Sequence, residues 1–251
     1  KRCMKNDLDP TAIPHFSKIP RAELLAIQER YKERLAIIRS FMYKFIEKNK
    51  EIPIFVTVTD DKGNFIEYLG ARSLEETIVH QVGLDIGVQF REEIAGVSSV
   101  IAAIDLKRPV QTIGTDHYHH FLHQSACYSV PLFLNSNLIG TISIMTFLEH
   151  AHPMILTSLE TVADFIEREL ELLEENNYLD EMNQMILKQS NTGYVVVESN
   201  GLISKVNPKA QVLLQNVKEN ETYVQDIQLF GTLYDKYKNN DQIKGQKIVL
   251  G

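Results

Sequence analysis

A cluster of histidines beside a cysteine holds the side chains of this sequence best suited to metal or redox chemistry. The cluster consists of His117, His119, His120, His123 and Cys127. In an α-helix, His119 and His123 would share a face, a spacing that some zinc sites use. The nearest carboxylate is Asp116, and no acidic residue at helical spacing supports the pair. We therefore favour a histidine-rich polar loop or helix over a metal site, and we expect no cofactor.

Cys127 is also a candidate for redox sensing. Its neighbours Ala126 and Tyr128 belong to an apparent strand, and buried thiols are usually inert packing residues. The other cysteine, Cys3, lies far away in the sequence. This usage argues against a disulfide framework and favours a reduced, cytoplasmic setting. We expect Cys127 to be structural.

The rest of the sequence lacks the usual marks of an enzyme. Glu92 and Glu93 are adjacent, so in an extended segment they point apart and form no acid–base pair. Neither the phosphate-binding pattern G-x-x-x-x-G-K-[ST] nor a C-x-x-C pair occurs. The net charge of −7 argues against a nucleic-acid surface, and no apolar run reaches the length of a membrane span. We expect a protein that is not an enzyme.

Two apolar stripes predict long helices. The second stripe begins near Pro153 and continues to about Lys188. Its apolar residues repeat every three or four positions and lie opposite an acidic face. Its length and that face favour a coiled coil with a second copy of the chain. For the first stripe, core packing and a dimer interface remain open. The first stripe is Leu24, Ile27, Tyr31, Leu35, Ile38, Met42 and Phe45, and the second is Leu159, Val162, Ile166, Leu170 and Leu173.

Strand patterns surround two turn-rich segments. We expect hairpins of 54–59 with 65–69 and of 126–134 with 138–147, and short helices at 74–82 and 98–105. Residues 1–19 contain prolines and are expected to be irregular. A further module follows residue 193, with strands at 194–198 and 202–206 and a helix ending near 214. Asn207 stands between strand and helix, where its side chain can fix the turn.

Several motifs occur in the order found in one family. The segment Gly96–Ile104 is followed by Arg108-Pro109-Val110, Gly114–Tyr118 and Cys127–Leu132, and Arg2-Cys3 with Leu8-Asp9-Pro10 opens the chain. Over about residues 1–175 the sequence resembles the GAF domain of bacterial sigma-54-dependent activators. That group includes the regulators of acetoin and dihydroxyacetone catabolism. Residues 180–251 are similar to the first part of a PAS domain, through the Ser199-Asn200-Gly201 turn and Asn207-x-x-Ala210.

The resemblance implies an α+β fold with an antiparallel GAF sheet flanked by helices, long N- and C-terminal helices and an incomplete PAS-like module. The expected organisation is an irregular segment at 1–20, the GAF domain with flanking helices at 21–175, a connecting helix at 176–190 and the PAS-like module at 191–251. It also implies that the natural chain continues into the rest of PAS, an ATPase and a DNA-binding portion.

The function implied is signal sensing in a transcriptional activator. The GAF domain would bind a small metabolite or a partner protein, and the helical connector would relay the signal in a homodimer. The sequence departs from the family pattern at Ser98, Ile101 and Asp116, so its ligand need not be that of its relatives. The candidate ligand-binding residues are Phe90, Ser98, Ile101, His117, Tyr118, His123 and Tyr128.

Three alternatives stay open at this stage. The first is an interaction module without a small ligand. The second is a metal, haem or redox sensor that uses the histidines, with His119, His123 and Cys127 as the residues concerned. The third is methionine sulfoxide reduction, which GAF folds also support, although Cys3 and Cys127 are a poor set of thiols for it.

Overall fold

The computed structural model describes residues 8–70, 72–215, 217–227 and 230. The chain divides into two compact units, Lys1–Glu174 and Glu175–Gly251. The predicted Arg2-Cys3 motif lies outside the described residues, as do residues 231–251 of the expected PAS-like module. Within the part that is described, no helix is both long and apolar enough to cross a membrane.

The first unit is built on a five-stranded antiparallel sheet in the order β2-β1-β5-β4-β3. Both predicted hairpins are present. Gly63, Asn135 and Ser136 take positive φ in their turns, at 77°, 50° and 64°, a conformation that reverses a chain tightly. The strands are β1 (Phe55–Asp60), β2 (Phe65–Gly70), β3 (Val110–Ile113), β4 (Ser125–Leu134) and β5 (Asn137–Phe147). The predicted α+β class is confirmed.

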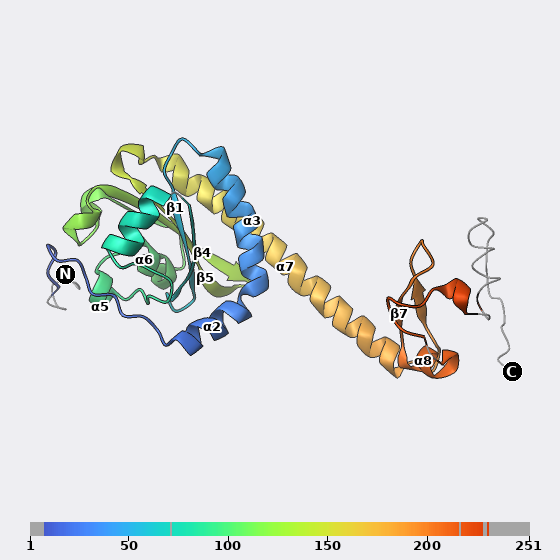
Figure 1. Cartoon of the computed structure of the whole chain (residues 1–251). Helices are drawn as coiled ribbons and strands as arrows, with labels where there is room; N and C mark the ends of the chain where they lie inside the picture. The colour runs from blue at the N-terminus through green and yellow to red at the C-terminus, as the bar shows by residue number, and fades with distance from the viewer. Residues whose placement is uncertain (1–7, 71, 216, 228–229, 231–251) are drawn as a thin grey trace. The chain divides into compact units, whose positions relative to one another are not determined.

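One face of the sheet is apolar and lies under long helices. The helices are α2 (Arg21–Arg30), α3 (Lys32–Lys48) and the first half of α7 (Pro153–Gln189). Figure 1 shows α3 and α6 on opposite sides of the strands. The sheet residues of this core include Val56, Val58, Tyr128, Ile142 and Ile144, all less than 2% exposed. Strand alternation brings them to one face, because successive side chains point in opposite directions.

The first predicted helix is interrupted at Tyr31. This residue has φ −93° and ψ 1° and separates α2 from α3, while its hydroxyl donates a hydrogen bond to Ile139 O at 2.6 Å. The apolar stripe from Ile27 to Phe45 lies in the core of its own unit. Core packing is therefore the correct interpretation of that stripe, and the dimer interface left open for it is wrong.

The second face of the sheet is covered by short elements. They are α4 (Arg72–Glu75), the π-helix η1 (Glu76–Gln81), α5 (Glu92–Ala95) and α6 (Ser99–Leu106). Short 3-10 turns, η2 (Gly114–Asp116) and η3 (His120–Leu122), follow β3, and η4 (Leu148–His150) follows β5. The sequence did not predict α5 or β3. The predicted helix at 74–82 is divided between α4 and η1.

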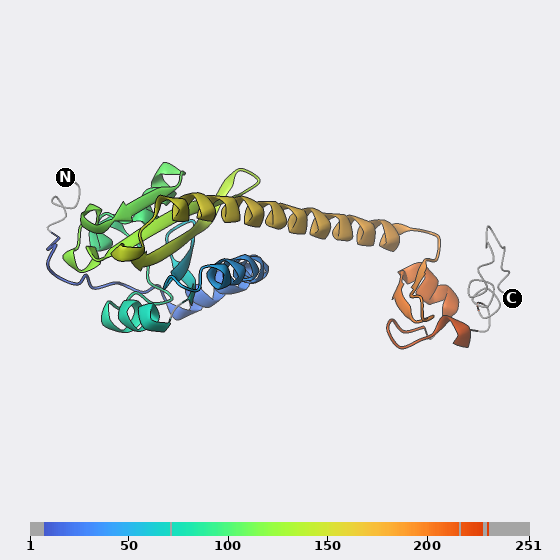
Figure 2. The same ribbon diagram turned by 90° about the horizontal axis from the view of Figure 1, so that it is seen from above.

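The helix α7 has 37 residues and runs without interruption (Figure 2). Its buried residues in the first unit are Ile155, Leu159, Ala163, Ile166 and Leu170. Polar contacts also hold it, because Glu167 Oε1 accepts from Phe133 N at 2.8 Å. Burial raises the pKa of Glu167, and the Phe133 hydrogen bond acts against that rise. The helix is therefore joined to β4 by both packing and a hydrogen bond.

The second unit contains a small sheet and a helix. They are β6 (Val195–Val197), β7 (Ile203–Val206) and α8 (Pro208–Leu214), with the short η5 (Val224–Asp226) after them. Asn207 fixes the turn before α8, as predicted. Its Oδ1 accepts from Tyr194 N and Ala210 N, and its Nδ2 donates to Leu187 O and Thr192 O. One side chain thus uses all four of its hydrogen-bonding positions.

Candidate ligand-binding site

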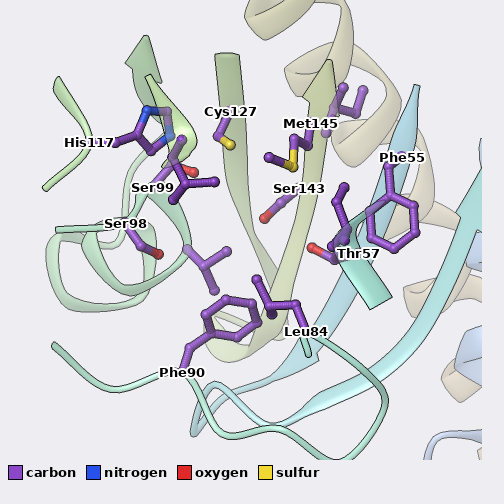
Figure 3. Close-up of a pocket in the computed structure, with 14 residues that line it drawn as sticks. Phe55, Thr57, Leu84, Phe90, Ser98, Ser99, His117, Cys127, Ser143 and Met145 are labelled. Carbon is purple, nitrogen blue, oxygen red and sulfur yellow. The ribbon is translucent and has the colours of Figure 1, made fainter. Parts of the chain in front are cut away.

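The first unit contains a partly open cavity of about 70 Å³ between the second face of the sheet and the short elements that cover it (Figure 3). Its walls are mostly aliphatic, aromatic and sulfur-containing side chains, with a few hydroxyls and one imidazole. The lining residues are Phe55, Thr57, Ile78, Leu84, Phe90, Ser98, Ser99, Val100, His117, Leu122, Cys127, Ser143, Ile144 and Met145.

A row of hydroxyls crosses the sheet beneath this cavity. Thr57 in β1 pairs with Ser143 in β5, which in turn pairs with Ser129 in β4. Ser129 Oγ lies 2.7 Å from Ser143 Oγ and 2.8 Å from Ser99 Oγ at the start of α6. Figure 3 shows Thr57 and Ser143 on the cavity side of the strands. The row therefore supplies the polar part of an otherwise apolar wall.

Two members of this row keep unused hydrogen-bonding capacity. The Thr57 hydroxyl has no hydrogen-bond partner among the described residues. The linked hydroxyls of Ser99, Ser129 and Ser143 carry three protons but form only two hydrogen bonds with one another, so one proton is left over. When Ser129 donates along the chain, that proton belongs to Ser99 or Ser143, and both of these residues line the cavity.

His117 lines the cavity as a neutral imidazole. Gly114 O lies 3.0 Å from its Nδ1, and a carbonyl can only accept, so Nδ1 carries the proton. Nε2 then accepts from Thr112 Oγ1 at 3.0 Å. Burial lowers the pKa of His117, against smaller opposing effects of the Gly114 hydrogen bond and the Asp116 charge. Because both nitrogens are occupied, the ring presents its carbon face to a ligand.

Cys127 faces the cavity beside Met145, its partner across β4 and β5. Burial raises the pKa of the Cys127 thiol to about 12. A thiol of this kind is protonated at neutral pH and is a poor nucleophile or metal ligand. The geometry agrees with the structural role expected for this residue.

Phe90 and Ser98 complete the predicted residues that line the cavity. Phe90 contributes its ring beside Leu84 (Figure 3). Ser98 is the N-cap of α6, where its Oγ accepts from Ile101 N at 3.5 Å. Thus Phe90, Ser98 and His117 are brought together around one space.

The other four predicted residues lie outside the cavity. Ile101 lines a separate surface groove along α5 and α6. Tyr118 donates its hydroxyl to Leu8 O at 2.6 Å, and its ring packs against Gly96. His123 Nε2 is 3.2 Å from His117 O, and its ring lies against His120.

Tyr128 is displaced from the cavity by strand alternation. It follows Cys127 in β4, so its side chain enters the core on the first face of the sheet. There its hydroxyl accepts from His152 N at 3.0 Å, directly before α7. Tyr128 therefore lies on the opposite face of β4 from Cys127, and its expected place in the ligand pocket is wrong.

The histidines do not assemble a metal site. His119 is only 2% exposed, its ring contacts Tyr118 and Phe121, and neither ring nitrogen has a hydrogen-bond partner in the described structure. The segment forms a 3-10 turn, so His119 and His123 do not share a helical face. Across the described residues, no three His, Cys, Asp or Glu side chains are grouped to hold a metal ion. The metal-sensor alternative has no donor set there.

Sequence reasoning missed Thr57, Ser143 and Met145 as lining residues. Alternation places Thr57 on the face opposite Val56 and Val58, and the same period in β5 separates Ser143 and Met145 from Ile142. That signal identifies a second face. It does not say that short elements leave a space above it.

Comparison with known proteins finds sequence similarity to transcriptional regulators. It is 24% identical over 171 residues to the acetoin dehydrogenase operon transcriptional activator AcoR of Bacillus subtilis (strain 168), a match that covers 67% of this chain and 28% of the relative. It is 25% identical over 134 residues to the acetoin catabolism regulatory protein of Cupriavidus necator, covering 53% of this chain and 20% of that protein. The chain is thus similar in sequence to two regulators of acetoin metabolism.

A solved structure agrees in fold. The crystal structure of the E. coli DhaR(N)–DhaL complex matches with a TM-score of 0.66 and 19% identity, covering 97% of this chain and 85% of that one. No family model matches the chain. The chain spans less than a third of the length of each of the two curated relatives. These matches agree with the resemblance predicted from the motifs, since both curated relatives are named as regulators of acetoin metabolism.

Proposed function

We propose that this chain is the signal-sensing region of a bacterial transcriptional activator. In this proposal the cavity of the first unit receives a small molecule, and α7 relays its presence to the PAS-like second unit and onward to an ATPase and a DNA-binding portion. A relay requires that the ligand bind differently to two conformations of the protein, since otherwise it shifts no equilibrium.

The observation that carries the proposal is the position of β4 between the cavity and α7. Cys127 faces the cavity, and its neighbour Tyr128 bonds His152 N at the start of α7. Farther along the strand, Phe133 N donates to Glu167 within α7. A ligand that moves β4 therefore acts on this helix at two points.

We further propose that α7 pairs with α7 of a second copy. Its exposed apolar side chains include Phe165, Leu172, Leu179 and Ile186, each seven residues from the next and 46–60% exposed. A repeat of seven places side chains along one line of a helix and generates a left-handed coiled coil. This line lies away from the buried face that contains Ile166 and Leu170.

The proposal is tested in the full-length regulator with a promoter reporter. Cells are grown on different carbon sources, with either the intact protein or a protein that lacks residues 8–174. We expect the intact protein to change transcription with the carbon source, and the shortened protein to give one constant output. A shortened protein that still follows the carbon source would show that sensing occurs elsewhere.

A second candidate is recognition of a partner protein, favoured by the surface groove of α5 and α6. It has a volume of about 350 Å³ and includes two exposed apolar side chains, Val97 and Leu106, at 41% and 54% exposure. The E. coli regulator of similar fold was solved in complex with another protein, DhaL. If a partner binds here, Leu106→Asp will abolish its co-purification, whereas Leu25→Asp, an equally exposed site on α2, will not.

A further inference from the structure

We propose that the cavity of the first unit selects a short, uncharged molecule with a single oxygen function, such as a small ketone, over a polyol or a carboxylate of the same size. The inference names the ligand class of the cavity, and its regulatory meaning rests on the proposed function. It follows from the volume of the cavity, from the absence of charge in its wall and from the small number of hydrogen bonds it can offer.

Volume limits the ligand to a few heavy atoms. An apolar cavity of about 150 Å³ holds one benzene molecule, with its six carbon atoms. The cavity here measures about 70 Å³, which leaves room for roughly three or four heavy atoms by the same comparison. Larger metabolites would require Leu84, Phe90 or the neighbouring wall to move.

Charge is excluded by the lining. Among the lining side chains that the structure describes, none is an Asp, Glu, Lys or Arg. His117 is held neutral by burial, and its two nitrogens are bonded to Gly114 O and Thr112 Oγ1. A carboxylate ligand would lose its hydration without gaining a cation, which is costly in a buried site.

Among the described lining residues, the polar groups besides His117 are the hydroxyl row and Ser98, whose Oγ already accepts from Ile101 N. Ser99 and Ser143 are already bonded to Ser129, so the row offers the free Thr57 hydroxyl and one remaining serine proton. One ligand oxygen can be satisfied by donation from these groups. A diol or triol brings further donors and acceptors to walls made by Phe55, Leu84 and Met145, where they find no partner.

Three probes of four heavy atoms each separate these possibilities: acetone, acetate and ethane-1,2-diol. Each is titrated into the 251-residue chain carrying ¹³C-labelled methionine methyl groups, and the Met145 signal is followed by NMR. We expect acetone to shift this signal saturably, with a dissociation constant on the order of 10 mM, since so small a ligand has few contacts. The signal of Met42, buried in the other core, is the internal control. Acetate and ethane-1,2-diol are expected to bind at least 10-fold more weakly.

Two variants test the site itself. Thr57→Val removes the free hydroxyl with little change of shape and should weaken acetone binding about 2- to 10-fold, the effect of one hydrogen bond. Cys127→Leu fills the cavity and should abolish the Met145 response while the spectrum of Met42 keeps its folded position. Thr161→Val, at an exposed site on α7, is the matched control and should leave binding unchanged.

Other outcomes would overturn the inference. Acetate or the diol binding as tightly as acetone would show that the ligand class is wrong. A Met145 signal that none of the probes moves would show that the cavity admits no such ligand. An unchanged affinity in Thr57→Val would contradict recognition by the hydroxyl row. None of these results bears on the reporter experiment, which tests signal sensing in the full-length protein without assuming a ligand class.

Discussion

Neighbouring residues of β4 connect two environments on opposite faces of one sheet. Cys127 is part of the cavity wall, while Tyr128, fully buried, bonds the backbone directly before α7. Neither side chain can change place without moving the strand, because their directions are fixed by the backbone. At the scale of single residues, the link between cavity and helix is therefore a property of strand geometry.

The Tyr128 hydroxyl should stabilise the fold measurably. Tyr128→Phe removes the hydrogen bond from His152 N and keeps the ring, so we expect a loss of about 1 kcal/mol in the free energy of unfolding. Urea denaturation measures the change. Tyr43→Phe, at a tyrosine that is 57% exposed, is the control. Equal effects of the two substitutions would show that the His152 contact contributes nothing.

His117 should make stability depend on pH. Burial lowers its pKa in the folded protein below the ordinary value of 6.5, so the unfolded chain binds a proton more readily. The stabilisation is complete above pH 6.5 and is lost as the pH falls below 6.5 toward the folded pKa. We expect His117→Gln to lose less stability than the unmodified protein between pH 7 and pH 5.

Denaturation series at several pH values test this expectation. The groups that face His117 are Asp116, which raises its pKa, and His123, which lowers it. His15→Gln, at an exposed position, serves as the control for general effects of removing a histidine. Parallel pH profiles for His117→Gln and the unmodified protein would contradict the prediction.

Among the elements, α7 has two apolar sides, of which one is packed in the first unit and the other is exposed. Ile155, Leu159 and Ile166 lie in the core of the first unit, whereas Phe165 and Leu172 remain exposed. A helix that is apolar on both sides exposes one of them unless a further partner covers it. The unpaired side has the seven-residue spacing that favours a second copy of α7.

Charge placed on that side should weaken self-association. Leu179→Glu puts a carboxylate at a coiled-coil core position, and we expect its dimer dissociation constant to rise at least 10-fold. Sedimentation equilibrium measures the change. Asn177→Glu adds the same charge at an exposed position off the stripe and should have little effect. A chain that is monomeric at high micromolar concentration before substitution would rule out the pairing.

Elements with strong periodicity could be predicted from the sequence, and weakly patterned ones could not. The stripe through Leu159 and Ile166 predicted α7 almost to its ends. Tyr31 fits the apolar stripe of one continuous helix, so only its bond to Ile139 O reveals the interruption. The strand β3 has four residues at the edge of the sheet and follows Pro109 directly, which is too short a pattern to recognise.

The candidate site was predictable only in part, because sequence patterns show local periodicity but not the contacts between distant residues. Residue type drew attention to Phe90, Ser98 and His117, and all three line the cavity. Periodicity could have removed Tyr128 from that set, since it alternates with Cys127. The space above Thr57 is bounded by residues such as Ile78 of η1, Ser99 of α6 and Met145 of β5, and that arrangement depends on contacts between residues distant in the sequence.

For the molecule as a whole, charge sets what it can bind. The sequence carries 33 acidic and 26 basic residues, a net charge of −7. Binding to duplex DNA without sequence preference requires basic side chains that neutralise phosphates. We therefore assign no nucleic-acid contact to this chain.

This assignment is checked by fluorescence anisotropy with a labelled duplex of arbitrary sequence. At about 100 mM salt we expect no binding up to 10⁻⁴ M protein, the weak end of ordinary non-specific affinity. A basic DNA-binding domain measured in the same buffer is the positive control. Salt-dependent binding in the micromolar range would contradict the assignment.

Asn207 has a mechanical consequence for the end of α7. Its amide joins a carbonyl in the last turn of that helix, Leu187 O, to the backbone of Tyr194 before β6 and of Ala210 in α8. Terminal turns of helices commonly fray, and a frayed turn would absorb a rotation of the helix rather than pass it on. Here the last turn is tied to the strand and helix that follow, so we expect this end of α7 to resist fraying.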